Sequence, residues 1–310
     1  MSEPKRHHYI PRFYLEGFRP DSEEYLHVFD REKSELRKQT PLNTMVSKYY
    51  YSFEDVDGSK NTEIESSVLR IVERDAKQVI DRLNNRESIC LEERLDFALF
   101  VAFMMNRTPD FERSLNTVTS GIIKKITSIG TSNDEWFTQF ADSYKKDTDK
   151  EFNLTAEELN NLIQNSRLEL HPNMRLWYML ELSQTMSNYF SQMNWAVLHC
   201  PDNCSFVTTD QPFTVVDTKS STRGFFGAGL IDDDVKKIIP LSKKTCLEML
   251  DHGNSITHHD IDDELVRQIN LTVAVGSDRY VIGDSRSLLS GIASEIQSFE
   301  RRDKGSIRLD

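Results

Sequence analysis

Apolar and polar residues follow two different periods in the first third of the chain. From Tyr25 to Thr40 the sequence YLHVFDREKSELRKQT alternates on both sides of a charged centre, which is typical of a β-hairpin. From Thr62 the apolar spacing changes to three and four residues. Thr62 with Glu65 fits a capping box, so the pattern predicts a helix with one buried face. Residues 91–107 are apolar on nearly all sides, which predicts a helix at the centre of the core.

The middle of the chain keeps the helical period. We expect one helix at about 110–129, a shorter one at 136–144 and a long one through 173–193, with a capping box at Thr155 and Glu158 between them. The first of these helices carries apolar residues that we expect to face inward, namely Phe111, Leu115, Val118, Ile122 and Ile126. The middle of the chain is therefore predicted to be a layer of helices.

The last third returns to short β-rich runs such as NWAVLHC and KKIIPLS, with a helix through Leu265 and a final helix after Ser287. We predict an α+β fold, a single domain with a predominantly helical middle packed on a mainly antiparallel C-terminal sheet and an N-terminal β-hairpin. Within residues 1–310, the predicted parts are an anchor segment with the hairpin (1–60), the helical layer (61–193) and the sheet with closing helices (194–310).

Composition narrows the classes of function. A chain of 310 residues with a net charge of −12 repels polyanions, so no broad nucleic-acid-coating surface is expected. The longest apolar run, FALFVAFMM, is about half of the roughly twenty residues that a membrane helix needs, so no membrane span is expected. Four cysteines are too few for a disulfide framework in a chain of this size, which favours a reducing, cytoplasmic location.

The common catalytic signatures are missing from the sequence. It contains no glycine-rich phosphate loop, nucleophile elbow, HExxH helix or paired CxxC, so the cofactor stays unknown. The run HCPDNC brings His199 near two cysteines, but a turn with small buried thiols explains it more simply. The run HHDIDDE (258–264) has carboxylates for a cation, but a loop whose Asp residues cap the next helix is the simpler interpretation. We therefore predict no metal site.

Two polar residues follow buried segments and are candidates for a functional site. Asp210, in TTDQPF, comes directly after a predicted buried strand, where a carboxylate can project into a cleft. An Asx turn that bonds its own backbone is the alternative. Arg107 ends the most apolar helix, where it either clamps an anion or donates to the last carbonyls of that helix. Both pairs of interpretations stay open.

The opening run HHYIPRFYLEGF combines two histidines with aromatic residues. Phe13 and Tyr14 are among the rings that would anchor this segment against the apolar helix. An imidazole fixed in this way and flanked by Arg12 suits general acid–base work or recognition of a phosphate. The alternative is that His7 and His8 lie on the surface before the first ordered turn.

Several segments together resemble a known family. In order along the chain, HHYIPRFYLEGF, TPLNTMVSKYYY, LFVAFMMNRTPDF, FVTTDQPF and RQINLTVAVGSDRYVI are similar to the bacterial family catalogued as DUF4238, a domain of unknown function. The likeness runs almost end to end, although Ile10, Arg12, Thr209 and Gln211 depart from the usual motifs. The resemblance implies that the polar motif positions of this chain would bind an anionic group if they converge, and these are His8, Arg107, Asp210, Asn270 and Arg279.

Two functions are consistent with this set of residues. The first is a hydrolase that acts on a phosphate-bearing substrate such as nucleic acid or a nucleotide, with His8 and Asp210 as catalytic groups. The substrate-binding residues would be Arg12, Arg107, Asn270 and Arg279. The second function is a non-catalytic anion-binding or regulatory module, as in a toxin or defence system. Both predict a phosphate-bearing ligand, and neither names a protein partner.

Overall fold

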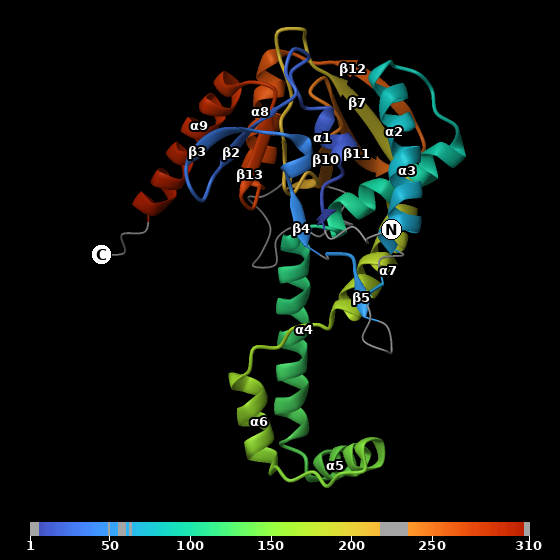
Figure 1. Ribbon diagram of the computed structural model, residues 1–310, viewed down its shortest axis with the longest axis vertical. Coiled ribbons are helices and arrows are strands. Elements are labelled where there is room, and N and C mark those ends of the chain that lie inside the picture. Colours follow the sequence, from blue (N-terminus) through green and yellow to red (C-terminus); the bar gives the residue numbers. More distant parts are fainter. Residues whose placement is uncertain (1–5, 49, 55–59, 62–63, 218–234, 307–310) are drawn as a thin grey trace. The chain divides into compact units, whose positions relative to one another are not determined.

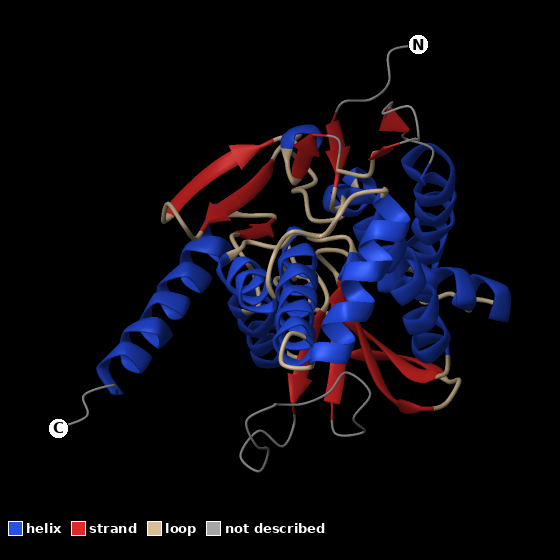
Figure 2. Ribbon diagram, turned by 90° about the horizontal axis from the view of Figure 1, so that it is seen from below, coloured by secondary structure: helices blue, strands red, loops and turns tan. Residues whose placement is uncertain are grey.

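The computed structural model describes residues 6–48, 50–54, 60–61, 64–217 and 235–306. The chain divides into two compact units, which we call the first unit (1–109 with 176–310) and the second unit (110–175). The first unit holds the β-sheets, and the second unit is helical (Figures 1 and 2). The α+β class is therefore confirmed. The single-domain organisation stays a prediction, since compactness alone does not show whether the units fold together.

The largest sheet of the first unit comes from the last third of the chain, as predicted. Its five strands lie in the order β12-β7-β11-β10-β9, and only the β12–β7 pair is parallel. The strands are β7 (Met193–His199), β9 (Thr214–Asp217), β10 (Val235–Pro240), β11 (Thr245–His252) and β12 (Ile256–Asp260). The sequence predicts a loop for the histidines of the run HHDIDDE, but these histidines belong to strand β12. Their neighbours in β7 supply backbone partners that the polar sequence does not reveal.

A second sheet joins the two ends of the chain. The predicted hairpin is confirmed as β2 (Leu26–Asp30) and β3 (Glu35–Gln39), which pair antiparallel. Strand β13 (Tyr280–Gly283) lies between β2 and the short strand β8 (Thr208–Thr209), so the order is β3-β2-β13-β8. Helix α9 (Arg286–Ser306) follows β13 and covers the apolar side chains of this sheet. The hairpin is thus built into the C-terminal half of the fold.

Helix α3 (Leu91–Asn106) is the central helix that its apolar sequence predicts. It packs on the five-stranded sheet, where the rings of Phe97 and Trp195 are 5.8 Å apart. The Arg94 guanidinium lies 4.2 Å from the Trp195 ring centre and donates to the carbonyl of Ser191. Helix α2 (Arg70–Asn84) packs beside α3 through Val79, Ile80 and Leu83, among others. The capping box expected at Thr62 lies outside the described residues.

The opening segment is an ordered part of the first unit. Strand β1 (Arg6–His8) pairs with β4 (Val46–Lys48), and helix α1 (Arg12–Glu16) follows it. The Phe13 and Tyr14 rings lie 5.7 and 6.4 Å from the ring of Phe100 in α3. The expected aromatic anchor is therefore confirmed. The alternative of a loose surface tail is wrong, because β4 supplies a pairing partner forty residues along the chain.

The second unit is built from three helices and the start of a fourth. They are α4 (Pro109–Gly130), α5 (Asp134–Thr148), α6 (Ala156–Asn165) and α7 (Pro172–Ser191), of which α7 continues into the first unit. The predicted capping box is present at the start of α6, where Thr155 and Glu158 bond each other's backbone N–H groups. The ring of Phe152 packs against Phe140 and Tyr144, 5.2 Å from each.

One expectation about the second unit is wrong. The predicted inward face of α4 faces outward, because Val118, Ile122 and Ile126 are all exposed. Thr127 is buried on the opposite side of the helix, and the Asn116 side chain accepts from the backbone N–H of Leu170. The helix itself is therefore confirmed. The side of α4 that packs within the second unit is the polar side, not the apolar side.

Candidate functional site

Asp210 lies directly after β8, and its carboxylate is fully engaged by backbone. It accepts from the N–H groups of Asp278, Arg279 and Tyr280, at 3.0, 2.7 and 2.9 Å, just where β13 begins. The Asx-turn alternative is wrong, because these donors lie about seventy residues away in the chain. Burial raises the pKa of Asp210 to about 6, although the three N–H donors act in the opposite direction. The carboxylate joins β8 to β13.

Arg279, the residue before β13, links this strand to the hairpin strand β2. Its guanidinium forms a two-bond ion pair with Asp30 at the end of β2, at 3.0 and 2.9 Å, and Arg37 of β3 donates to the same carboxylate at 3.0 Å. Burial opposes the charge of Asp30, but these two arginines outweigh it and lower its pKa to about 2. The ion pair therefore fastens β13 to the hairpin.

Asn270 of α8 (Asp263–Val275) has both ends of its side-chain amide engaged. The oxygen accepts from the N–H of Val207, and the nitrogen donates to the carbonyl of Ser205, each at 2.9 Å. This amide holds the segment that leads into β8. We refer to Asp210, Asn270, Arg279 and Asp30 together as the β13 cluster, since all four fix the strands around β13.

Arg107 belongs to a separate buried network. It donates to the Tyr51 hydroxyl at 2.9 Å, to Glu73 at 2.8 Å and to the carbonyl of His8 at 2.8 Å. Burial opposes its charge, but Tyr51 and Glu73 raise the pKa of Arg107 above its usual value. The guanidinium therefore has three partners within the fold. It ties the opening segment to α2 and α3.

The two histidines of the opening run have different surroundings. His7 is buried, stacks on the Tyr51 ring and accepts from the Tyr51 N–H through Nδ1 at 2.9 Å. The His8 ring is half-buried, and its Nε2 lies 3.3 Å from the carbonyl of Pro41, to which it donates in the matching tautomer. Burial lowers the pKa of His8, so this imidazole is neutral at pH 7. Arg12 is exposed and ion-paired with Glu16.

The predicted site residues therefore lie in separate groups. His8 and Arg107 share one network, while Asp210, Asn270 and Arg279 belong to the β13 cluster. Tyr9, next to His8 in the chain, senses the other group, since its pKa is raised by burial first and then by the charge of Asp210. Among the bonds of the described residues, none joins the His8 ring to Asp210 or Asn270. Their catalytic and substrate-binding roles stay predictions.

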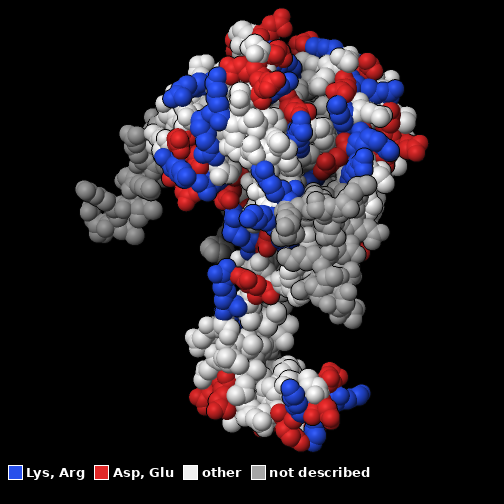
Figure 3. All heavy atoms as spheres, viewed as in Figure 1, with Lys and Arg blue, Asp and Glu red and all other residues white. Residues whose placement is uncertain are grey.

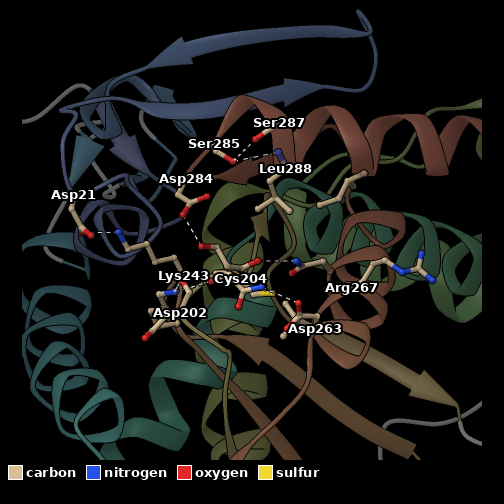
Figure 4. A pocket seen from close by; sticks show the side chains of 16 residues that line it. Asp21, Asp202, Cys204, Lys243, Asp263, Arg267, Asp284, Ser285, Ser287 and Leu288 are labelled. Carbon is tan, nitrogen blue, oxygen red and sulfur yellow. Dashed lines mark hydrogen bonds and ion pairs between the residues drawn. The ribbon is translucent and has the colours of Figure 1, made fainter.

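Asn270 also lines a cavity of about 510 Å³ (Figure 4). Small-molecule sites in proteins have volumes of roughly 300 to 1,000 Å³, so a molecule of nucleotide size fits. The walls come from the 202–205 loop, the turn after β10, the first half of α8 and the first turn of α9. Lys243 reaches into this cavity, which we call the Lys243 pocket.

Charges of both signs line the Lys243 pocket. Lys243 is ion-paired with Asp21 at 2.6 Å, and its side chain is 15% exposed whereas that of Asp21 is 95% exposed. On the facing wall, Ser205 donates to Asp284 at 2.6 Å, and the Ser285 hydroxyl caps the first turn of α9. Arg267 points away from the other labelled side chains in Figure 4.

Lys244 and Cys204 also line the pocket but are poor candidates for binding or reacting with a ligand. Lys244 donates to the carbonyls of Pro201, Asp202 and Cys204, so its ammonium group closes the 201–204 turn. Burial, followed by the neighbouring Asp263 carboxylate, raises the pKa of the Cys204 thiol. A protonated thiol is a poor nucleophile. Lys243, by contrast, has an exposed and readily displaced partner in Asp21.

Sequence reasoning missed this pocket and several partners of the predicted residues. Lys243 sits in an ordinary polar turn, LSKKT, and nothing in that run indicates a cavity. Tyr51 lies inside the family-like segment TPLNTMVSKYYY, and Asp30 lies at the end of the first strand of the predicted hairpin. A tyrosine in that segment and a carboxylate at a strand end were the available signals. Only the fold reveals that they bond Arg107 and Arg279.

The two histidine-rich runs meet at the edge of the large sheet. His199 Nε2 and His258 Nδ1 are 2.9 Å apart, and burial lowers the pKa of His199 to about 4. Asp260 is ion-paired with Arg86, and Asp262 caps α8, which confirms the capping role expected of this run. In the described residues, no three metal-ligating side chains come together.

Surface charge is mixed on the face that Figure 3 presents. Lysine and arginine side chains alternate there with aspartate and glutamate side chains across the first unit, without one large patch of a single sign. Among the described helices, none is both long enough and apolar enough to cross a membrane.

Comparison with known proteins gives one match. The family described as "Protein of unknown function (DUF4238)" matches residues 6–287, which is nearly the whole chain. The match includes both the β13 cluster and the residues of the Lys243 pocket up to Ser287. No curated protein and no solved structure matches.

Proposed function

Because the chain belongs to the DUF4238 family, whose function is unknown, we propose its function from its own geometry: it binds a small phosphate-bearing molecule in the Lys243 pocket without turning it over. The observation that carries the proposal is the Lys243–Asp21 pair. An exposed carboxylate contributes little to such a pair, so a ligand oxyanion can replace Asp21 without leaving a buried charge unpaired.

The wall opposite Lys243 supports the same ligand chemistry. The first turn of a helix offers backbone N–H groups and the positive end of its dipole, and the first turn of α9 borders the pocket at Ser285 and Ser287. Both residues add hydroxyl donors. A phosphate group placed between Lys243 and this turn would meet donors from two sides.

The acidic residues of the pocket refine the ligand class. Asp263 and Asp284 lie on the walls beside α8 and α9, where they repel a second anionic group but accept hydrogen bonds from hydroxyl or amino groups. A ligand with one phosphate group and several hydroxyl or amino groups suits both the cationic side and the acidic side of the pocket. A sugar phosphate or a nucleoside monophosphate meets this description, whereas a polyphosphate or a nucleic acid does not.

Hydrolysis of a phosphate-bearing substrate is the second candidate function. The raised pKa of Asp210, about 6, is the observation that favours it, since a group that titrates near neutrality suits proton transfer. However, both carboxylate oxygens of Asp210 accept backbone N–H bonds, and Arg107 is occupied by Tyr51 and Glu73. We therefore place binding ahead of catalysis.

Calorimetric titration tests the proposal with inorganic phosphate, ribose 5-phosphate and adenosine monophosphate. We expect adenosine monophosphate to bind, and Lys243→Gln to weaken binding about ten- to hundredfold, as the loss of one charge-assisted bond predicts. Asp21→Asn should strengthen binding, because it removes the competing carboxylate. Lys77→Gln, an exposed lysine on α2, is the matched control and should bind as the wild type does.

The opposite signs of the two variants make this test specific. Equal affinity in the wild type and in Lys243→Gln would remove the Lys243 pocket from ligand binding. Absence of binding by all three probes at millimolar concentration would also reject the proposed ligand class. Release of inorganic phosphate from any probe, lost in Asp210→Asn and kept in Lys243→Gln, would instead support the hydrolase.

A further inference from the structure

Helix α4 of the second unit carries an apolar stripe on its exposed side. Val118, Ile122, Ile126 and Ile129 are 60, 53, 54 and 62% exposed. With 100° between successive residues, these four positions lie within about 80° of one another on the helix surface. Phe111 and Leu115, both half-buried, extend the stripe toward the start of the helix. Exposed apolar patches of this kind mark interaction surfaces on soluble proteins.

The opposite side of α4 is the one that the second unit uses. There Lys124 and Gln164 exchange bonds with each other's backbone carbonyls, at 2.8 and 2.9 Å, and Thr127 and Gly130 are buried. The internal contacts of this helix are therefore polar or involve small residues. The other side carries side chains that are more than half exposed, namely Val118, Ile122, Ile126 and Ile129.

The stripe has the seven-residue repeat of a coiled coil. One set of positions holds Leu115, Ile122 and Ile129, and the set that alternates with it holds Phe111, Val118 and Lys125. These sets are separated by three and four residues, which is the spacing of the two core positions of a heptad. The repeat continues for nearly three heptads, roughly 27 Å of helix.

A third set of positions beside the stripe is small throughout. Ser114, Gly121 and Ser128 also recur every seven residues, on the flank next to Leu115, Ile122 and Ile129. A side chain built on Gly121 would meet no atom within 4 Å, so the surface there is open. Small flanking residues let two helix backbones approach closely. The helix therefore offers the shape for close pairing as well as the apolar area.

We propose that α4 pairs with α4 of a second copy of this chain, in antiparallel orientation, through the apolar stripe. Charge favours this direction. The start of α4 carries Asp110 and Glu112, which pair with Arg113 and Arg175, and Lys125 lies in its second half within the heptad pattern of the stripe. An antiparallel pair keeps the Lys125 side chains of the two copies apart, whereas a parallel pair would place Lys125 against Lys125.

The antiparallel register follows from the heptad. In such a pair, the two kinds of core position face each other, so Val118 packs against Ile122 of the second copy and Lys125 against its Leu115. The small flank then faces itself, with Gly121 at the two-fold axis and Ser114 opposite Ser128. This arrangement is isologous and closes as a dimer, as a two-fold interface must.

Light scattering during size exclusion of the full chain tests the dimer. At a concentration on the order of tens of micromolar, the wild type is expected to be a dimer with twice the chain mass of 36.0 kDa. Ile122→Glu should raise the dimer dissociation constant by at least about a hundredfold, because it places a charge in the apolar interface of both copies. Ile123→Glu is the matched control, since Ile123 is also exposed but lies off the stripe.

Oxidative cross-linking then tests the register, in a Cys90→Ser background that removes the exposed native thiol. We expect Gly121→Cys to form a disulfide between copies. Ser128→Cys alone should stay unlinked, but it should link when mixed with Ser114→Cys. A monomeric wild type would overturn the proposal and leave the stripe to another protein or a lipid surface. The proposal would also be overturned if the Ile122→Glu variant stayed dimeric. It would be overturned equally if the Ser128→Cys variant formed a disulfide between copies without Ser114→Cys.

Discussion

Asn270 belongs to the β13 cluster and also lines the Lys243 pocket, and these two regions use polar residues in opposite ways. In the β13 cluster, the polar atoms of Asp210 and Asn270 are bonded to backbone groups of neighbouring strands. In the Lys243 pocket, an ammonium group reaches a cavity and has an exposed carboxylate as its partner. Polar residues at a buried strand end are thus bonded within the fold, whereas the residue to which we assign ligand binding comes from a surface turn.

The largest expected effect is on stability, from Asp210→Ala. The substitution leaves three buried N–H groups without their acceptor, so we expect a loss of about 3 to 5 kcal/mol in the free energy of unfolding. Urea denaturation followed by circular dichroism measures it, with the exposed Asp147→Ala as control. A loss below about 1 kcal/mol would break the comparison, because Asp210 would then be free for another role.

A smaller effect concerns the pH dependence of stability. The folded-state pKa of Asp30 is lowered to about 2, so its ion pairs stabilise the fold above the unfolded value near 4. That stability is lost as the pH falls through about 2. For Asp210 the sign is reversed, because its pKa is raised to about 6, and its contribution decreases as the pH rises from about 4 to 6.

Two variants separate these opposite slopes. Between pH 4 and pH 2, Asp30→Asn should lose less stability than the wild type loses. Between pH 4 and pH 6, Asp210→Asn should lack the decline that burial of a charged carboxylate causes. Thermal melts across this range measure both differences. Parallel curves for the wild type and both variants would show that neither carboxylate is linked to folding.

The sequence was informative where structure is local. The hairpin at 25–40 and the central helix α3 follow from apolar periods, and the aromatic anchor at Phe13 and Tyr14 was predicted with its partner helix. Helix α4 shows the limit of such reasoning. Its period was predicted correctly and its buried side was not, because periodicity does not reveal which side of a helix finds a partner.

The candidate site could be predicted only in part, for a similar reason. Asp210 and Arg107 follow buried segments, so their burial was foreseeable, but their partners at Tyr280 and Glu73 come from distant strands and helices. The Lys243 pocket has walls from five separate segments of the chain, at Asp21, 202–205, 243–244, 263–270 and 284–292. No single run of residues carries its signature, and cavities that many segments share become visible only in the fold.

The most direct test of the contrast is a nuclear magnetic resonance titration of the full chain with adenosine monophosphate. Amide shifts should change at Ser285, Ser287 and Lys243, which border the pocket, and stay constant at Arg279 and Tyr280, whose N–H groups hold Asp210. Shifts that instead concentrate at Arg279 and Tyr280, with none at Ser285 or Ser287, would contradict the account and place ligand binding at the β13 cluster.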